Sequence, residues 1–129
     1  MKKCIISTIM VIMMLSLQMG MCYAYPPTQS ATIYGYSARG SSTANYSNAV
    51  CDTSYSGNGS VSVWATYTYV NYYSGTQGTS SGSDSDGGWN KTASVTLSAP
   101  TQCMSKKVEA RHEVTGGGQT WITHTEDAY

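Results

Sequence analysis

Phenylalanine is absent from this sequence, and charged residues make up only 11% of it. Beyond residue 24 the chain holds ten valine, isoleucine and leucine residues in total. A core must therefore be completed by aromatic side chains, drawn from Trp64, Trp89, Trp121 and ten tyrosines. So few aliphatic residues could also indicate a disordered chain, and the hydrophobic pattern decides between the two readings.

Basic side chains are also scarce. After residue 24 the chain has five basic and seven acidic residues, a formal charge of −2. Binding to a nucleic-acid backbone or to an anionic lipid surface needs a basic patch, which this part of the sequence lacks. We therefore expect neither nucleic acid nor a membrane surface as a partner.

Long apolar runs are missing except at the N-terminus. Lys2 and Lys3 precede an uncharged apolar run at residues 4–17, which is too short for the roughly 20 residues of a membrane span. The run and the small residue Ala24 predict a signal peptide at residues 1–24, cleaved after Ala24. Acylation at Cys22 is the alternative, disfavoured by the bulky Met21. We expect one secreted, extracellular domain at residues 25–129, with no stable membrane anchor.

Cysteine is sparse as well. Cys4 and Cys22 belong to the predicted signal peptide, which leaves Cys51 and Cys103 in the exported domain. Two cysteines in an oxidising compartment predict one disulfide between them. In the chain-entropy model, closing that loop would stabilise the fold by roughly 4 kcal/mol.

Apolar and polar residues alternate with the period of a β-strand, which argues for an ordered domain. No stretch after residue 24 shows a convincing helical period. Gly117 and Gly118 predict a hairpin tip that places Val114 opposite Trp121 and Arg111 opposite His124. Segments 41–48 and 74–88 are small and polar, and are predicted to be loops. The strands are expected at residues 32–38, 49–55, 61–72, 92–99, 108–114 and 120–125.

Six strands without a helix between them predict an all-β fold, either a small antiparallel sandwich or an open barrel. Cys51, Trp64 and Cys103 resemble the inter-sheet disulfide and central tryptophan of immunoglobulin-like domains. Thr101 departs from that pattern, because a tyrosine usually stands two residues before the second cysteine. The resemblance implies a fold and carries no function with it.

Groups suited to catalysis or metal binding are few. His112 and His124 are the available bases at neutral pH, and the predicted hairpin register points them to opposite faces. We expect His112 to be a hydrogen-bonded, half-buried core residue and rank a hydrolase using it last. Asp84 and Asp86 could bind calcium on a glycine-rich loop, but further acidic ligands are missing nearby, so a solvated loop is favoured. No cofactor is predicted.

Tyrosine and tryptophan supply the remaining functional signal. Tyr72, Tyr73 and Trp89 lie beside the predicted loop at 74–88 and are the candidate ligand-binding residues, because aromatic rings can stack on sugars or pack on proteins. The sequence favours a secreted non-enzymatic domain that binds a cell-surface glycan or another exported protein. A secreted antimicrobial or toxin-like factor is the alternative, and the oligomeric state is left open.

Overall fold

The computed structural model describes residues 24–129, and the remainder of the predicted signal peptide, residues 1–23, lies outside this range. The described chain is built from antiparallel strands without a helix, so the all-β prediction is confirmed. Within residues 24–129, no helix is long and apolar enough to cross a membrane. The strands are β1 (Thr28–Ile33), β2 (Tyr36–Ala44), β3 (Asn48–Asn71), β4 (Gln77–Ser98), β5 (Cys103–Gly116) and β6 (Gln119–Ala128).

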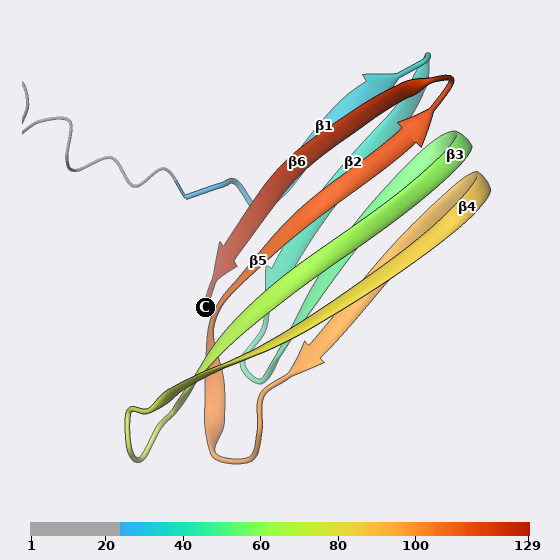
Figure 1. Ribbon diagram of the computed structural model, residues 1–129. Coiled ribbons are helices and arrows are strands. Elements are labelled where there is room, and N and C mark those ends of the chain that lie inside the picture. The colour runs from blue at the N-terminus through green and yellow to red at the C-terminus, as the bar shows by residue number, and fades with distance from the viewer. Residues whose placement is uncertain (1–23) are drawn as a thin grey trace, which may run out of the picture.

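These strands form one sheet in the order β1-β2-β3-β5-β6, with β4 paired to β3 (Figure 1). The two longest strands, β3 and β4, curve over and run back, so each contributes to two layers. The first half of β3 pairs with β2 and with the second half of β4. Its second half pairs with β5 and with the first half of β4.

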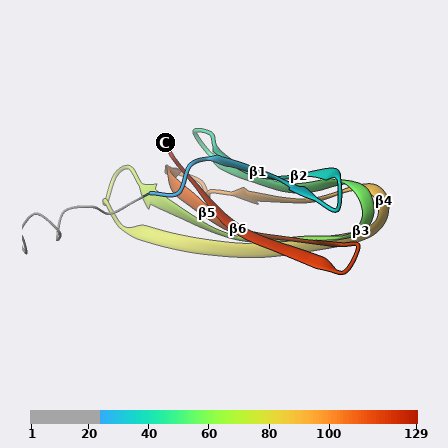
Figure 2. The same cartoon turned by 90° about the horizontal axis from the view of Figure 1, so that it is seen from above.

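Two facing layers result, joined where β3 and β4 curve (Figure 2). The first layer holds β1, β2 and one half each of β3 and β4; the second holds β5, β6 and the other halves. We call the curved pole the bent end and the opposite pole the open end. β1 and β6 lie side by side at the margin of the sheet, which is nearly closed into a barrel.

The curvature of β3 and β4 has a local cause. The β3–β4 register shifts between Tyr55 and Asn58, as in a β-bulge, which bends a strand sharply. At Gly59 the backbone of β3 approaches β5 so closely that a Cβ would collide with the carbonyl oxygen of Thr115. A glycine is required there because no side chain fits between the two strands.

The core lies between the two layers and follows the predicted alternation. The inward residues of both halves of β3 are buried, while their neighbours are more exposed. Tyr55 and Tyr67 supply the volume that aliphatic residues lack. Each keeps its hydroxyl bonded, Tyr55 donating to the carbonyl of Ile33 at 3.0 Å and Tyr67 bonding Ser105 Oγ at 2.6 Å. Buried hydrophobic residues include Ala49, Cys51, Val61, Val63, Ala65, Ala93, Val95, Val108, Ala110 and Val114.

The predicted β5–β6 hairpin is confirmed residue by residue. Val114 pairs with Trp121 and Arg111 with His124, and Trp121 packs against the core. Gly117 and Gly118 form the turn with φ of 56° and 76°, a region that glycine enters without steric penalty.

Several predicted boundaries are wrong, and the strands predicted at 49–55 and 61–72 are one continuous strand, β3. Residues 32–38 are not one strand, because Tyr34 and Gly35 form a turn with φ of 48° and 82° between β1 and β2. Segment 41–48 is mostly strand, since β2 continues to Ala44. Segment 74–88 is not a loop either, because β4 begins at Gln77 and pairs with β3 along its length. Its small residues are needed: Gly78 leaves room for the Tyr69 ring, which a Cβ would strike.

The predicted disulfide does not form, and both Cys51 and Cys103 are free. Cys51 lies in the core, where its thiol donates to Ser42 Oγ at 3.4 Å. Cys103 begins β5 at the open end and pairs with Asn71. Two contacts between the layers, Thr53 with His112 and Ser105 with the carbonyl of Asn48, fix their relative register. By that register the cysteines are separated by roughly 20 Å along the strands, whereas a disulfide needs Cα atoms within about 7 Å.

The immunoglobulin-like arrangement of cysteines and tryptophan is therefore not formed. Trp64 is not a central core residue, since its side chain lies on the outer face of the second layer and is 42% exposed. The two layers are joined by β3 and β4, which run through both, and not by a disulfide packed on a central tryptophan.

Candidate functional site

The residues predicted to bind a ligand do not come together. Tyr72 and Tyr73 are exposed in the turn between β3 and β4 at the open end, with ring centroids 4.6 Å apart. Trp89 is 60% exposed at the bent end, where it pairs with Asn58. Asn58 and Asn71 are thirteen positions apart on β3, a path of roughly 40 Å. Trp89 and the tyrosine pair therefore do not line one compact site.

A groove lies on the outer face of the second layer. It has a volume of about 550 Å³ and crosses four strand segments. We call it the Trp64 groove. Its floor follows one row of the sheet register, in which Ser83, Trp64, Arg111 and His124 are successive neighbours from β4 to β6. Adjacent strands lie about 4.8 Å apart, so the row spans roughly 14 Å. The groove is thus an elongated surface suited to an extended ligand.

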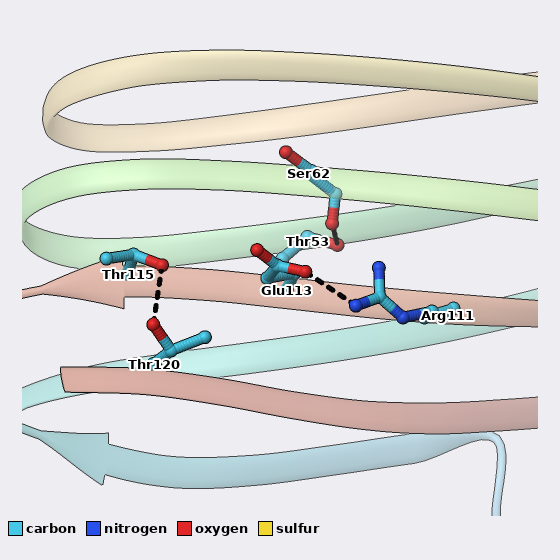
Figure 3. A network of polar contacts seen from close by, with 6 residues as sticks. All are labelled: Thr53, Ser62, Arg111, Glu113, Thr115 and Thr120. Carbon is cyan, nitrogen blue, oxygen red and sulfur yellow. Dashed lines mark hydrogen bonds and ion pairs between the residues drawn. The ribbon is translucent and has the colours of Figure 1, made fainter.

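Trp64 and Arg111 form the centre of this row. The Arg111 guanidinium carbon lies 4.7 Å from the Trp64 ring centroid, a cation–π distance. The same guanidinium donates from Nη2 to Glu113 Oε2 at 2.6 Å (Figure 3). These two contacts hold a planar, charged donor group over an exposed aromatic ring.

The margins of the groove add further aromatic and polar groups. Tyr25 stacks on His124 with ring centroids 5.3 Å apart and planes at 30°. The next row of the register contributes Ser81, Thr66 and Glu109. Glu109 is paired with Lys107 at 3.0 Å. The lining therefore combines flat rings with hydroxyl, carboxylate and guanidinium groups, which can both donate and accept hydrogen bonds.

Metal binding is not supported by the acidic residues that suggested it. The Asp84 carboxylate accepts a bond from the backbone N–H of Ser94 at 2.9 Å. Asp86 accepts from the backbone of Gly87 and pairs with Lys91 at 3.5 Å. Among residues 24–129, no group of three or more His, Cys, Asp or Glu side chains could hold a metal ion.

His112 is fully buried rather than half-buried, and it is hydrogen-bonded as predicted. Its Nδ1 lies 2.8 Å from Thr53 Oγ1, and its Nε2 lies 2.7 Å from Thr125 Oγ1. Gly40 makes room for the ring, because a Cβ there would collide with it. Burial lowers the pKa of His112 from 6.5 to about 4, aided by His124 and opposed by Asp52. A residue so enclosed cannot reach a substrate.

The bonds around His112 form one continuous chain, from which its tautomer can be assigned. Thr53 donates to the carbonyl of Ser62 at 3.0 Å (Figure 3), so its oxygen accepts from Nδ1–H. Nε2 then accepts from Thr125, which accepts from Ser42, which accepts from Cys51. Every group is satisfied with a neutral imidazole. This series of hydrogen bonds lies in the core and joins β2 and β3 to β5 and β6.

Sequence reasoning placed Trp64 in the core and missed its role in the groove. A signal was present, because Trp64 stands between Ser62 and Thr66 on the polar face of the alternating segment 61–72. The predicted pairing of Arg111 with His124 had already located half of the row. The contribution of Ser81 and Ser83 was hidden by the interpretation of 74–88 as a loop.

Comparison with known proteins adds no further assignment. No protein-family model matches the chain, and the comparisons with curated proteins and with solved structures found no match.

Proposed function

We propose that this chain is a small exported, non-enzymatic domain that binds an oligosaccharide of a cell surface in the Trp64 groove. One observation carries the proposal. An exposed tryptophan, backed by Arg111, lies in the floor of an elongated groove whose lining also holds side chains that donate and accept hydrogen bonds. Sugar rings present apolar C–H faces and a rim of hydroxyls, and both match this lining. Export in this proposal depends on the signal-peptide pattern at residues 1–24.

The groove fits an oligosaccharide better than a single sugar or a metal ion. Its volume of about 550 Å³ is in the range of ordinary small-molecule sites. The row from Ser83 to His124 offers polar contacts on both sides of the Trp64 ring. An exported protein could use the same surface, and the glycan is preferred because the lining sets an exposed aromatic ring among hydroxyl and charged side chains.

The test is binding of protein purified from expression of the full chain to soluble cell-wall polysaccharides, measured by calorimetry. Trp64→Ala should weaken binding at least about tenfold, since it removes the stacking face. Tyr73→Ala is the matched control, because Tyr73 is 77% exposed yet lies at the open end outside the groove. Equal affinities for the Trp64→Ala variant and the unaltered protein would reject the groove as the site. Binding of a peptide instead of any polysaccharide would favour a protein partner.

The antimicrobial alternative depends on chain size and predicted export alone. The purified protein would then inhibit the growth of neighbouring cells, and variants with a substitution in the Trp64 groove would inhibit it equally. That result would favour an antimicrobial role over glycan binding.

A further inference from the structure

We infer that the bent end carries a second, separate binding site, which takes a single neutral pyranose ring. The site is a cleft of about 270 Å³, lined by Tyr34, Tyr36, Tyr55, Asn58, Trp89 and Gly117. We call it the Trp89 cleft. It shares no lining residue with the Trp64 groove. Asn58 and Trp64 are six residues apart on β3, roughly 20 Å. The inference is thus independent of the proposed function.

The aromatic rings of the cleft are fixed against one another. Tyr36 meets Tyr55 edge to face at 6.2 Å and 81°, and meets Trp89 in the same manner at 5.6 Å and 80°. Tyr55 is itself buried and anchored by its hydroxyl to the carbonyl of Ile33. Trp89 remains 60% exposed although it contacts a fixed neighbour. An aromatic face is therefore held toward solvent by a rigid base.

The backbone adopts positive φ at two residues at or beside this cleft. Tyr34 has φ of 48° and Asn90, next to Trp89, has φ of 53°. Positive φ is uncommon for residues other than glycine, and it is especially unfavourable for a bulky side chain. Strained residues persist where the surrounding structure imposes them, often at binding sites. Asparagine enters this region more readily than tyrosine, so the strained residue that lines the cleft is Tyr34.

The position of Tyr34 is supported by contacts from another hairpin. Its backbone N–H donates to Gln119 Oε1 at 3.1 Å. Its ring lies over Gly117, where a Cβ would collide with it. The β1–β2 turn and the β5–β6 turn are thus fitted together, and the ring of Tyr34 remains 66% exposed above them.

The chemistry of the lining selects the ligand. All six lining residues are uncharged, whereas the Trp64 groove contains Glu109, Arg111 and His124. A charged ligand would lose hydration in this cleft without gaining a partner of opposite charge. Aromatic faces favour the apolar C–H face of a pyranose, and the Asn58 amide can both donate to and accept from its hydroxyls. The cleft is smaller than typical ligand pockets, so it fits one ring rather than a chain.

The test follows backbone amide and indole N–H signals of the protein by NMR during titration with three neutral probes and one charged probe. The neutral probes are methyl glucoside, methyl galactoside and N-acetylglucosamine, and the charged probe is glucuronic acid. We expect saturable shifts of the Trp89 indole and the Tyr34 amide with at least one neutral probe. Trp89→Ala should weaken that binding about tenfold, and Trp64→Ala should leave it unchanged.

A second variant separates binding from folding. Tyr34→Asn should raise the melting temperature, because asparagine adopts positive φ more readily, and should still weaken sugar binding. Absence of shifts at Trp89 with all three neutral probes overturns the inference, as does equal binding of glucuronic acid. If the Trp64→Ala variant loses polysaccharide binding but keeps the sugar-induced shifts at Trp89, both sites are supported. If that variant still binds the polysaccharide, only the Trp64 groove is rejected.

Discussion

At the scale of single residues, His112 links the stability of the fold to pH. The folded chain holds it neutral, since burial lowers its pKa to about 4 while the unfolded chain keeps about 6.5. Between these values the unfolded state binds more protons, so stability is complete above pH 6.5 and is lost as the pH falls toward 4. The expected loss is about 3 kcal/mol at 1.4 kcal/mol per pH unit.

Urea unfolding at a series of pH values measures this slope. His112→Gln removes the titrating group and should flatten the curve, although the variant starts from a lower stability. His124→Gln, at the exposed histidine of the groove, should largely retain the slope. A pH-independent free energy of unfolding between pH 4 and 6.5 in the unaltered protein would contradict a neutral His112.

The two thiols should differ in reactivity. Burial raises the pKa of the Cys51 thiol, and the group is enclosed in the core, so the reactive thiolate is suppressed. Cys103 is only partly buried at the start of β5. In a thiol-specific colorimetric assay on protein that lacks residues 1–24, the folded form should show one fast-reacting thiol and the unfolded form two. A chain that shows no free thiol even after unfolding would restore the disulfide that the structure lacks.

At the scale of elements, the close approach of β3 to β5 depends on Gly59. Gly59→Ala introduces a Cβ that collides with the Thr115 carbonyl and should destabilise the fold by about 2 kcal/mol. Gly87→Ala is the matched control on β4, since its Cβ would meet only the Gly59 carbonyl oxygen at an ordinary 3.7 Å. Thermal melts of both variants provide the comparison. Equal melting temperatures would mean that β3 can shift to absorb the added group.

Elements with apolar residues on one face could be predicted from the sequence, and those without could not. The core faces of β3 and β5, and the β5–β6 register, were predictable because valines and alanines alternate with polar residues. The first half of β4 was missed because serine and glycine stand on both of its faces, so no period marks it. The turn at Tyr34 was also missed, because tyrosine is typical of strands and does not indicate the positive φ of 48° that it adopts here.

The candidate site was predictable only in part, because it depends on which strands are neighbours. Arg111 and His124 were paired from the hairpin alone. Trp64 and Ser83 join them only when β3 bends and β4 follows it, and that bend originates in a register shift that alternation does not encode. The separation of Trp89 from Tyr72 and Tyr73 could not be predicted either, because it depends on the length of β3 and β4 that is paired between them.

At the scale of the whole molecule, the shared strands should make unfolding a single event. β3 and β4 run through both layers, so neither layer can lose its strands while the other keeps its own. We expect one transition in calorimetry, with equal calorimetric and van't Hoff enthalpies. Two separate transitions would show that the halves of β3 behave as independent strands despite their continuity.

The placement of the two ends of the described chain has a practical consequence. Pro27 accepts a bond from Ser42 near the end of β2, and the ring of Tyr129 meets that of Tyr46 in the turn that follows it, so both ends leave from the same pole. A bead, dye or fusion partner attached at either end would hang from that pole. The opposite pole, with the exposed rings of Tyr34 and Trp89, would stay unobstructed and point outward.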